Sequence, residues 1–166
     1  ARLISYDRFD KSIPKPISPG KLTNNQLAIR KLRNGFVESG FNEVLTYSLV
    51  PIDKEDKRIK ISNPLLSETS SLRDNIWEEH IKICNQNLNS GRDSCWIFEI
   101  GNIFLNKEEY MEEETLNGAM YGDNKFEKWE NTGKNLDINF YEARGKLREA
   151  LTLLKIDIVD KPTAKY

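Results

Sequence analysis

The segment from residue 23 to residue 51 most constrains the fold, because it joins a helix with clear ends to a strand with a clear stop. Thr23 and Gln26 have the spacing of a capping box, in which two free donors at a helix start are satisfied. Gly40 is placed to end that helix in the left-handed conformation. The apolar positions between them recur at helical spacing: Ala28, Ile29, Leu32, Phe36 and Val37. One face of this helix must therefore pack against another layer.

An alternating stretch, "FNEVLTYSLVP", follows that helix directly. Its two sides carry Leu45, Tyr47 and Leu49 on the one hand and Val44, Thr46 and Ser48 on the other. Pro51 ends the stretch, since proline has no backbone donor for a sheet. We therefore predict a strand that begins after Gly40 and stops at Pro51.

Further strands are predicted at residues 57–61, 95–105 and 115–121. The middle one alternates Trp96, Phe98 and Ile100 against Ile97, Glu99 and Gly101. Two more helices are expected, one from about Asn75 and one from about Asn139. Their apolar stripes are Trp77, Ile81, Cys84 and Leu88 in the first, and Phe140, Leu147, Leu151 and Leu154 in the second. The expected fold class is α+β, an antiparallel sheet flanked by helices.

The first 20 residues differ from the rest, because Pro14, Pro16 and Pro19 lie close together with Gly20 behind them. Each proline removes a donor and favours extended geometry in the residue before it. We expect residues 1–20 to be the tail of a preceding domain and a linker, and residues 21–166 to form one domain.

Composition excludes several classes of function. The 25 basic and 26 acidic side chains give a net charge of −1, which provides no general attraction to nucleic acid or to anionic lipid. Cys84 and Cys95 have neither a zinc spacing nor a disulfide framework, so free thiols in a reducing cytoplasm are expected. No apolar run is long enough to span a membrane, and no metal site is predicted.

Motifs for catalysis are missing as well. The sequence has no glycine-rich phosphate loop, and its one histidine, His80, lies in the middle of a predicted helix, where a packing role is expected. The glutamate-rich run "KEEYMEEET" at residues 107–115 has no apolar surroundings to shift its pKa values, so we interpret it as a solvated hairpin tip. No catalytic residue is predicted.

Six stretches occur in the order, and nearly the spacing, of the phenylalanyl-tRNA synthetase beta subunit: "RLISYDRF", "PISPGKLT", "SGFNEVLTYSLV", "NPLLSETSSLR", "FEIGNIF" and "NFYEARGKLREALTLL". The chain therefore resembles this family over most of its length. Ser5 departs from the family pattern, which usually has glycine before Tyr6. The resemblance places residue 21 onward in the catalytic-like module, whose fold is that of class II aminoacyl-tRNA synthetases, ending before the motif 3 region.

The resemblance also implies a division of labour between chains. ATP-dependent activation of phenylalanine, with magnesium, belongs to the alpha subunit, whereas this part of beta keeps the fold without the active site. Motif 2 of a class II enzyme places an arginine on the α-phosphate. The corresponding positions in "WIFE" and "FLNK" are Ile97 and Leu105, and motif 3 has no counterpart. The expected partners are the alpha subunit, a second beta chain and, in the whole enzyme, phenylalanine tRNA.

Motif 1, which forms the dimer interface of class II synthetases, has a better match. The helix at residues 24–39, followed by Gly-Phe and a strand ending in proline, fits its pattern. The resemblance thus implies a subunit interface that includes Arg30, Lys31, Arg33, Phe41 and Pro51.

The stretch "SNPLLSETSSLRDNIW" raises a separate question. In the family's alpha chain a Leu-Arg-Thr word at this place is followed by residues that hold the amino group of the substrate. Here the word is Leu72, Arg73, Asp74 and Asn75, with Asn75 better explained as a helix cap paired with Glu78. We interpret the stretch as a former substrate loop kept for structure. Arg73 should then be partly buried and bonded to carbonyls or to a carboxylate such as Glu68 or Glu99, and its loss should cost about 1–3 kcal/mol.

Two alternatives remain open at this point. The chain could be a degenerate class II paralogue that binds an amino acid or adenylate without transferring it. It could also contact tRNA through basic residues of the arm and the first helix, namely Arg8, Lys11, Lys15, Lys21, Arg30, Lys31 and Arg33.

Overall fold

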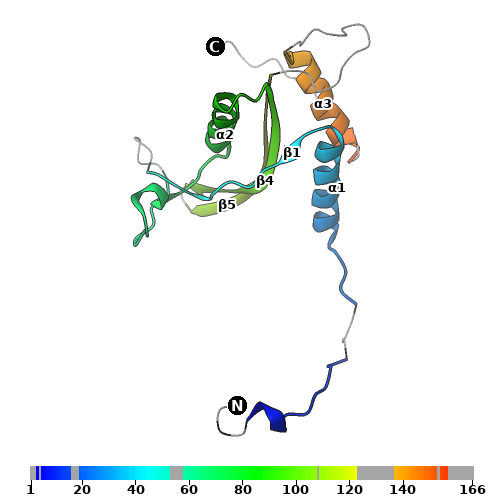
Figure 1. Cartoon of the computed structure of the whole chain (residues 1–166), viewed down its shortest axis with the longest axis vertical. Coiled ribbons are helices and arrows are strands. Elements are labelled where there is room, and N and C mark those ends of the chain that lie inside the picture. Colours follow the sequence, from blue (N-terminus) through cyan, green and yellow to red (C-terminus); the bar gives the residue numbers. More distant parts are fainter. Residues whose placement is uncertain are drawn as a thin grey trace.

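The computed structural model describes residues 3, 5–15, 19–52, 58–107, 109–122, 137–152 and 154–156. Its helices and strands follow one another as shown in Figure 1. They are α1 (Asn24–Glu38), β1 (Asn42–Glu43), β2 (Leu49–Val50), β3 (Ser71–Leu72), α2 (Trp77–Asn89), β4 (Ser94–Asn106), β5 (Tyr110–Gly122) and α3 (Phe140–Thr152). Short 3-10 turns cover η1 (Tyr6–Arg8) and η2 (Ser67–Thr69). Within these residues, no helix is both long and apolar enough to traverse a bilayer.

The start and end of α1 agree with the sequence prediction. The Thr23 hydroxyl accepts from the Gln26 amide, and the Gln26 side chain accepts from the Thr23 amide at 2.8 Å. Gly40 has a φ of 93°, which glycine adopts without strain and which ends the helix. The described residues 5–15 and 19–23, before α1, form an arm that extends away from the helices and the sheet (Figure 1).

The main sheet has the strand order β1-β4-β5 and is mixed, so the prediction of an antiparallel sheet was only partly right. β4 and β5 form a long antiparallel hairpin, whereas β1 pairs with β4 in parallel, with Asn42 opposite Ile97. The connection from β1 to β4 passes through α2 instead of a tight turn, and such a crossover allows the strands to run the same way.

The strand predicted before Pro51 is interrupted. Only β1 and β2 are regular, and β2 pairs with β3 in a separate antiparallel pair. The strand predicted at residues 57–61 lies partly outside the described residues, and its described part contributes one bridge, between Lys60 and Ser71.

Helices cover both faces of the β4–β5 hairpin (Figure 1), with α1 and α3 on one face and α2 on the other. The core on the α1 side contains Phe36, Phe41, Trp96, Phe98 and Ala150, all at most 6% exposed. The alternation predicted along β4 is therefore confirmed, because Trp96 and Phe98 share this side. The main chain of α3 approaches α1 so closely that a Cβ on Gly35 would lie 2.4 Å from the Ala150 carbonyl oxygen.

Some details of the predicted apolar faces were wrong. Val37 is 52% exposed and Phe140 is 73% exposed, because the buried sides of α1 and α3 are centred on Phe36 and Ala150. Lys107, Glu109 and residues 110–114 of the glutamate-rich run are exposed as expected, but from Tyr110 onward the run belongs to β5 instead of a hairpin tip.

Candidate functional site

The face of β4 that is turned toward α2 carries a buried polar cluster. Glu99 on β4 is 0% exposed, and Arg73, which follows β3, is 2% exposed. Arg73 Nη1 donates to Glu99 Oε1 at 2.9 Å, and its Nε donates to the Asn102 carbonyl at 2.8 Å. Glu68 and Glu99 were the two carboxylates expected as partners of Arg73, and Arg73 bonds to Glu99.

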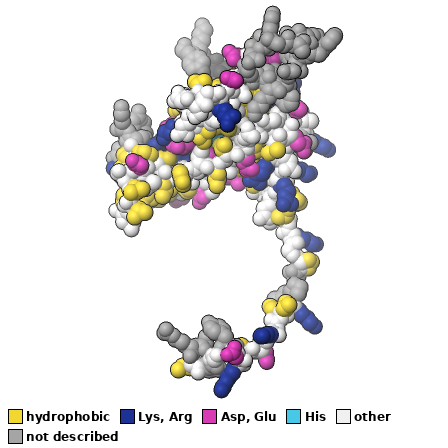
Figure 2. All heavy atoms as spheres, viewed as in Figure 1, with side chains coloured by type: hydrophobic (Ala, Val, Ile, Leu, Met, Phe, Trp, Pro, Cys, Tyr) yellow, Lys and Arg dark blue, Asp and Glu magenta, His cyan; other side chains and the backbone are white. Residues whose placement is uncertain are grey.

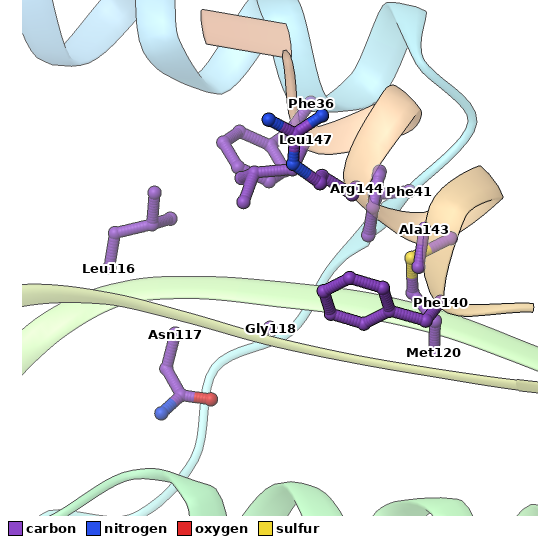
Figure 3. Close-up of a pocket in the computed structure, with 10 residues that line it drawn as sticks. All are labelled: Phe36, Phe41, Leu116, Asn117, Gly118, Met120, Phe140, Ala143, Arg144 and Leu147. Atoms are coloured by element: carbon purple, nitrogen blue, oxygen red, sulfur yellow. The ribbon is translucent and has the colours of Figure 1, made fainter. Parts of the chain in front are cut away.

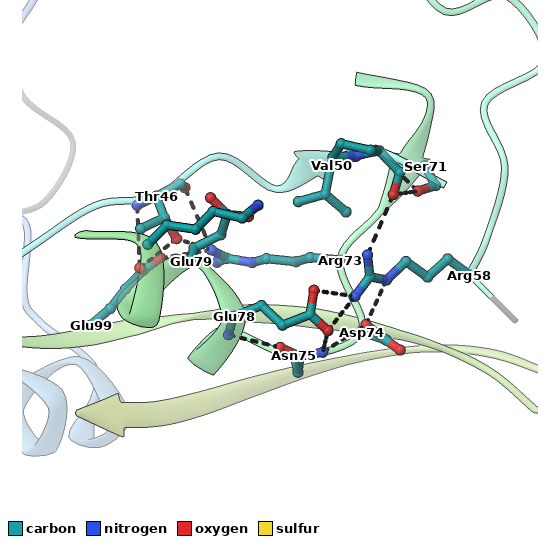
Figure 4. Close-up of polar contacts among 12 residues, drawn as sticks. Thr46, Val50, Arg58, Ser71, Arg73, Asp74, Asn75, Glu78, Glu79 and Glu99 are labelled. Atoms are coloured by element: carbon teal, nitrogen blue, oxygen red, sulfur yellow. Dashed lines mark hydrogen bonds and ion pairs between the residues drawn. The ribbon is translucent and has the colours of Figure 1, made fainter. Parts of the chain in front are cut away.

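Thr46 completes this cluster from the segment between β1 and β2 (Figure 4). Its hydroxyl donates to Glu99 Oε2 and accepts from Arg73 Nη1, both at 2.7 Å, and its amide also donates to Glu99 at 3.2 Å. One buried ion pair thus holds the segment after β1, the segment after β3 and β4 together. The full set of hydrogen bonds makes the burial of both charges tolerable.

Gly101 leaves room for this arrangement. A Cβ at this position would lie 2.6 Å from Arg73 Nη2 and 2.9 Å from Glu99 Oε1. Any side chain larger than hydrogen would displace the guanidinium of Arg73. The ion pair between Arg73 and Glu99 therefore requires glycine at position 101.

His80 on α2 lies against the same carboxylate. It is 1% exposed, and its Nε2 is 3.5 Å from Glu99 Oε2. Burial lowers the pKa of the imidazole below its usual value, although the nearby Glu99 acts in the opposite direction. The ring is therefore a buried neutral group at neutral pH, in agreement with the packing role expected from the sequence.

A second polar cluster surrounds Arg58, which is 8% exposed. Its Nη2 donates to both oxygens of Glu78 at 2.7 and 2.8 Å, and its Nε donates to Asp74 at 2.8 Å (Figure 4). Burial opposes the charged form of Arg58, but the bonds to Glu78 and Asp74 outweigh it and raise the pKa of the guanidinium. The bonds from Arg58 lower the pKa of Glu78 in turn, against the effect of burial.

Asn75 belongs to this second cluster too. Its side-chain oxygen accepts from the Glu78 amide at 3.2 Å, which is the capping bond predicted from the sequence. The reciprocal bond differs, because the Glu78 carboxylate accepts from the Asn75 side chain instead of its backbone amide. The regular helix begins two residues later, at Trp77. All four residues of the predicted loop are thus half-buried or buried, and the side chains of Arg73, Asp74 and Asn75 are bonded within this chain.

The residues expected at a subunit interface differ in their exposure to solvent. Arg30, Lys31 and Pro51 are exposed, whereas Arg33 is half-buried and its Nε donates to Glu43 at 2.6 Å. Phe41 is only 6% exposed and packs against Phe36, Trp96 and Phe98, so it serves the core of this chain and offers little surface to a partner.

Residues 44–49 form an apolar surface to which no role was assigned from the sequence. Along residues 44–49 half-buried and exposed positions alternate, and the exposed ones are the large apolar side chains. Leu45 is 90% exposed and Tyr47 is 84% exposed. Leu49, at the start of β2, is also exposed, and so are Ile52, Leu65 and Leu66 outside this stretch. Figure 2 shows hydrophobic side chains gathered at the left edge of the folded part, where residues 60–70 lie in Figure 1.

The two stretches that take the place of motif 2 both lie on β4. Ile97 is 3% exposed and faces α2, and Leu105 is half-buried near the end of the strand. Neither position carries the cation that an α-phosphate would need. Among the described residues, no group of three or more His, Cys, Asp or Glu side chains is arranged to hold a metal ion.

A cavity of about 530 Å³ lies on the other face of the hairpin, between α1, β5 and α3 (Figure 3). Its lining is mainly apolar and aromatic: Phe36, Phe41, Leu116, Met120, Phe140, Ala143 and Leu147, with Asn117, Gly118 and Arg144. Arg144 is the one charged residue among them.

The fold is similar to that of part of a tRNA synthetase. A solved structure of PylSc, a pyrrolysyl tRNA synthetase of Desulfitobacterium hafniense, matches 81% of this chain and 46% of its own, with a TM-score of 0.56. At 15% identity this likeness concerns the fold alone. It agrees with the α+β, class II-like architecture expected from the sequence.

Sequence comparison identifies the family. A family model described as "Phenylalanyl tRNA synthetase beta chain CLM domain" matches residues 11–165. The phenylalanine–tRNA ligase beta subunit of Prochlorococcus marinus strain MIT 9312 is 63% identical over 163 residues, or 98% of this chain. That of Parasynechococcus marenigrum strain WH8102 is 44% identical over 162 residues. The chain belongs to the phenylalanyl-tRNA synthetase beta chain family, and it spans about 20% of the length of these relatives.

Proposed function

We propose that this chain is the noncatalytic, subunit-assembling part of the beta chain of a phenylalanine–tRNA ligase. The whole enzyme would attach phenylalanine to its tRNA with ATP and magnesium, in the cytoplasm, as an assembly of alpha and beta chains. This part of beta would bind the alpha subunit and the second beta chain.

The apolar outer side of residues 44–49 carries the proposal. Leu45 and Tyr47 are 90% and 84% exposed, although the backbone between them is held firmly by the bonds of Thr46 to Arg73 and Glu99. A rigid segment that presents large apolar side chains outward is suited to a partner surface. Arg30 and Lys31 of the proposed interface are exposed on α1, which precedes this segment in the motif 1-like region.

The bonds made by the former substrate loop, residues 72–75, support the proposal that this chain is noncatalytic. Arg73 is bound to Glu99, Asp74 to Arg58, and Asn75 to Glu78, so each of these side chains already has a partner inside the chain. A working pocket needs groups that are free to bind a substrate.

The test is association of full-length beta with the alpha subunit, measured by analytical ultracentrifugation. Tyr47→Asp places a charge on the apolar surface and should weaken association at least tenfold, without loss of melting temperature. Tyr110→Asp is the matched control, since Tyr110 is 78% exposed on β5, and it should associate normally. Equal association of both variants with alpha would contradict the proposal.

Charge reversal on α1 tests the basic residues of the proposed interface. Arg30→Asp on α1 should weaken association, whereas Arg148→Asp on α3, which is also exposed, should not. If Arg30→Asp weakens binding of tRNA and leaves subunit association unchanged, the basic face contacts tRNA instead.

A further inference from the structure

The only two cysteines of the sequence lie in contact, although they belong to different elements. Cys84 is on α2 and Cys95 is on β4, and their Sγ atoms are 3.9 Å apart. Both are free thiols. A disulfide bond is about 2.05 Å long, so an approach of the two sulfurs by about 2 Å would join them.

The two thiols differ in access to solvent. Cys95 is 7% exposed, whereas Cys84 is only partly buried. On β5, Tyr121 lies opposite Cys95 in the strand register. A small oxidant therefore reaches Cys84 first, and Cys95 lies behind it as a second, protected thiol.

We propose that Cys84 and Cys95 form an oxidation site that closes to an intramolecular disulfide, fastening α2 to β4, when the protein meets a peroxide. This site is separate from the proposed subunit interface and goes beyond the assembly role.

The chemistry balances with hydrogen peroxide as the oxidant. The Cys84 thiolate attacks one peroxide oxygen, the O–O bond breaks, and the departing hydroxide takes up a proton to become water. The resulting sulfenic acid is then attacked by the Cys95 thiolate, which forms the S–S bond and releases a second water. Two thiols lose two electrons in total, and one peroxide is reduced to two waters.

The surroundings set the rate of the first step. Burial, with the neighbouring Cys95 as a further cause, raises the pKa of Cys84 to about 11. Since the thiolate is the reacting form, the attack of Cys84 on a peroxide is slow at neutral pH. The oxidation rate of the pair should rise about tenfold for each pH unit up to that pKa.

The experiment treats the 166-residue chain with hydrogen peroxide at pH 8, blocks remaining thiols with N-ethylmaleimide and measures the mass. We expect a mass lower by two hydrogens, no blocked thiol, a linked peptide containing Cys84 and Cys95, and reversal by dithiothreitol. The product should remain monomeric on a non-reducing gel. Disulfide-linked dimers, or sulfinic acid at Cys84 without a linked peptide, would overturn the proposal.

Two variants test the order of the steps. In Cys95→Ser, Cys84 should accumulate as a sulfenic acid that dimedone traps. In Cys84→Ser, Cys95 should stay reduced for at least ten times as long as the thiols of the unmodified chain. Circular dichroism checks that both variants are folded. Oxidation of Cys84→Ser at the rate of the unmodified chain would overturn the proposed roles, and this comparison does not depend on subunit assembly.

Discussion

Arg73 and Glu99 form an ion pair across 2.9 Å in which the two side chains are 3% and 1% exposed. They lie 26 residues apart in the sequence, on the segment after β3 and on β4, so their contact fixes how these parts of the chain meet. With Thr46 bonded to both, the pair connects the motif 1-like segment to the main sheet.

Removal of the cation should be costly. Arg73→Ala leaves the Glu99 carboxylate buried without its counter-charge, and loss of one partner of a buried pair typically costs about 3–5 kcal/mol. This exceeds the 1–3 kcal/mol expected from hydrogen bonds alone, because the structure shows both charges fully shielded. Urea unfolding followed by circular dichroism measures the loss.

Arg33→Ala is the matched control for that measurement. Arg33 bonds Glu43 at the surface, with side chains 40% and 38% exposed. Such solvent-exposed pairs contribute about 0–1 kcal/mol. If the two variants lose the same stability, the Arg73–Glu99 pair has no special role in the fold.

Gly101 allows a second test of the Arg73–Glu99 contact. Gly101→Ala brings a Cβ within 2.6 Å of Arg73 Nη2, so it should destabilise the protein by about 1–3 kcal/mol. Gly145→Ala on α3 is the control, since a Cβ there meets nothing within 4 Å. It should stabilise the helix by about 0.5–1 kcal/mol.

A double-mutant cycle locates the cause of the Gly101 effect. In an Arg73→Ala background the clash with the guanidinium is gone, and most of the cost of Gly101→Ala should disappear. Additive losses in the cycle would show that the alanine disturbs β4 itself.

The buried imidazole predicts a dependence of stability on pH. Burial lowers the pKa of His80 in the folded state below the unfolded value of 6.5. Above that value the ring is neutral in both states and contributes no pH dependence. Below it the unfolded chain binds a proton that the folded chain does not, so stability falls as pH falls, by at most about 1.4 kcal/mol per pH unit.

The groups that face His80 are Glu99 from β4, Asn117 from β5 and the more distant Arg73. As His80 is the only histidine of the sequence, the slope of the unfolding free energy between pH 6.5 and 5 should flatten in His80→Leu. If that variant does not fold, nuclear magnetic resonance of the imidazole provides the test. A ring that protonates in the folded chain at or above pH 6.5 would contradict it.

Local signals in the sequence predicted local structure well. The capping box at Thr23, the stop at Gly40 and the alternation of β4 were confirmed, because each depends on neighbouring residues alone. The bond of Arg73 to Glu99 was also predicted, because an arginine buried in a former substrate loop that is kept for structure needs a partner.

Contacts between distant segments were harder to predict. The parallel pairing of β1 depends on the path of the chain through α2, which no periodicity encodes. Thr46 and Arg58 gave no sequence signal beyond their polarity, although each holds two segments together. Phe41 was assigned to an interface by motif position, whereas its burial is set by Phe36 and Trp96 packing around it.

The last prediction concerns catalysis and ligand binding. The chain should not support phenylalanine-dependent exchange of pyrophosphate with ATP, because Ile97 and Leu105 stand where the phosphate-binding arginine of motif 2 belongs. Millimolar phenylalanine should also leave its melting temperature unchanged, since a ligand bound only by the folded state must raise it. The alpha subunit, assayed in the same buffer with beta, is the positive control. A rise in melting temperature that is lost in Asn75→Ala would show that the loop from Leu72 to Asn75 still binds an amino acid.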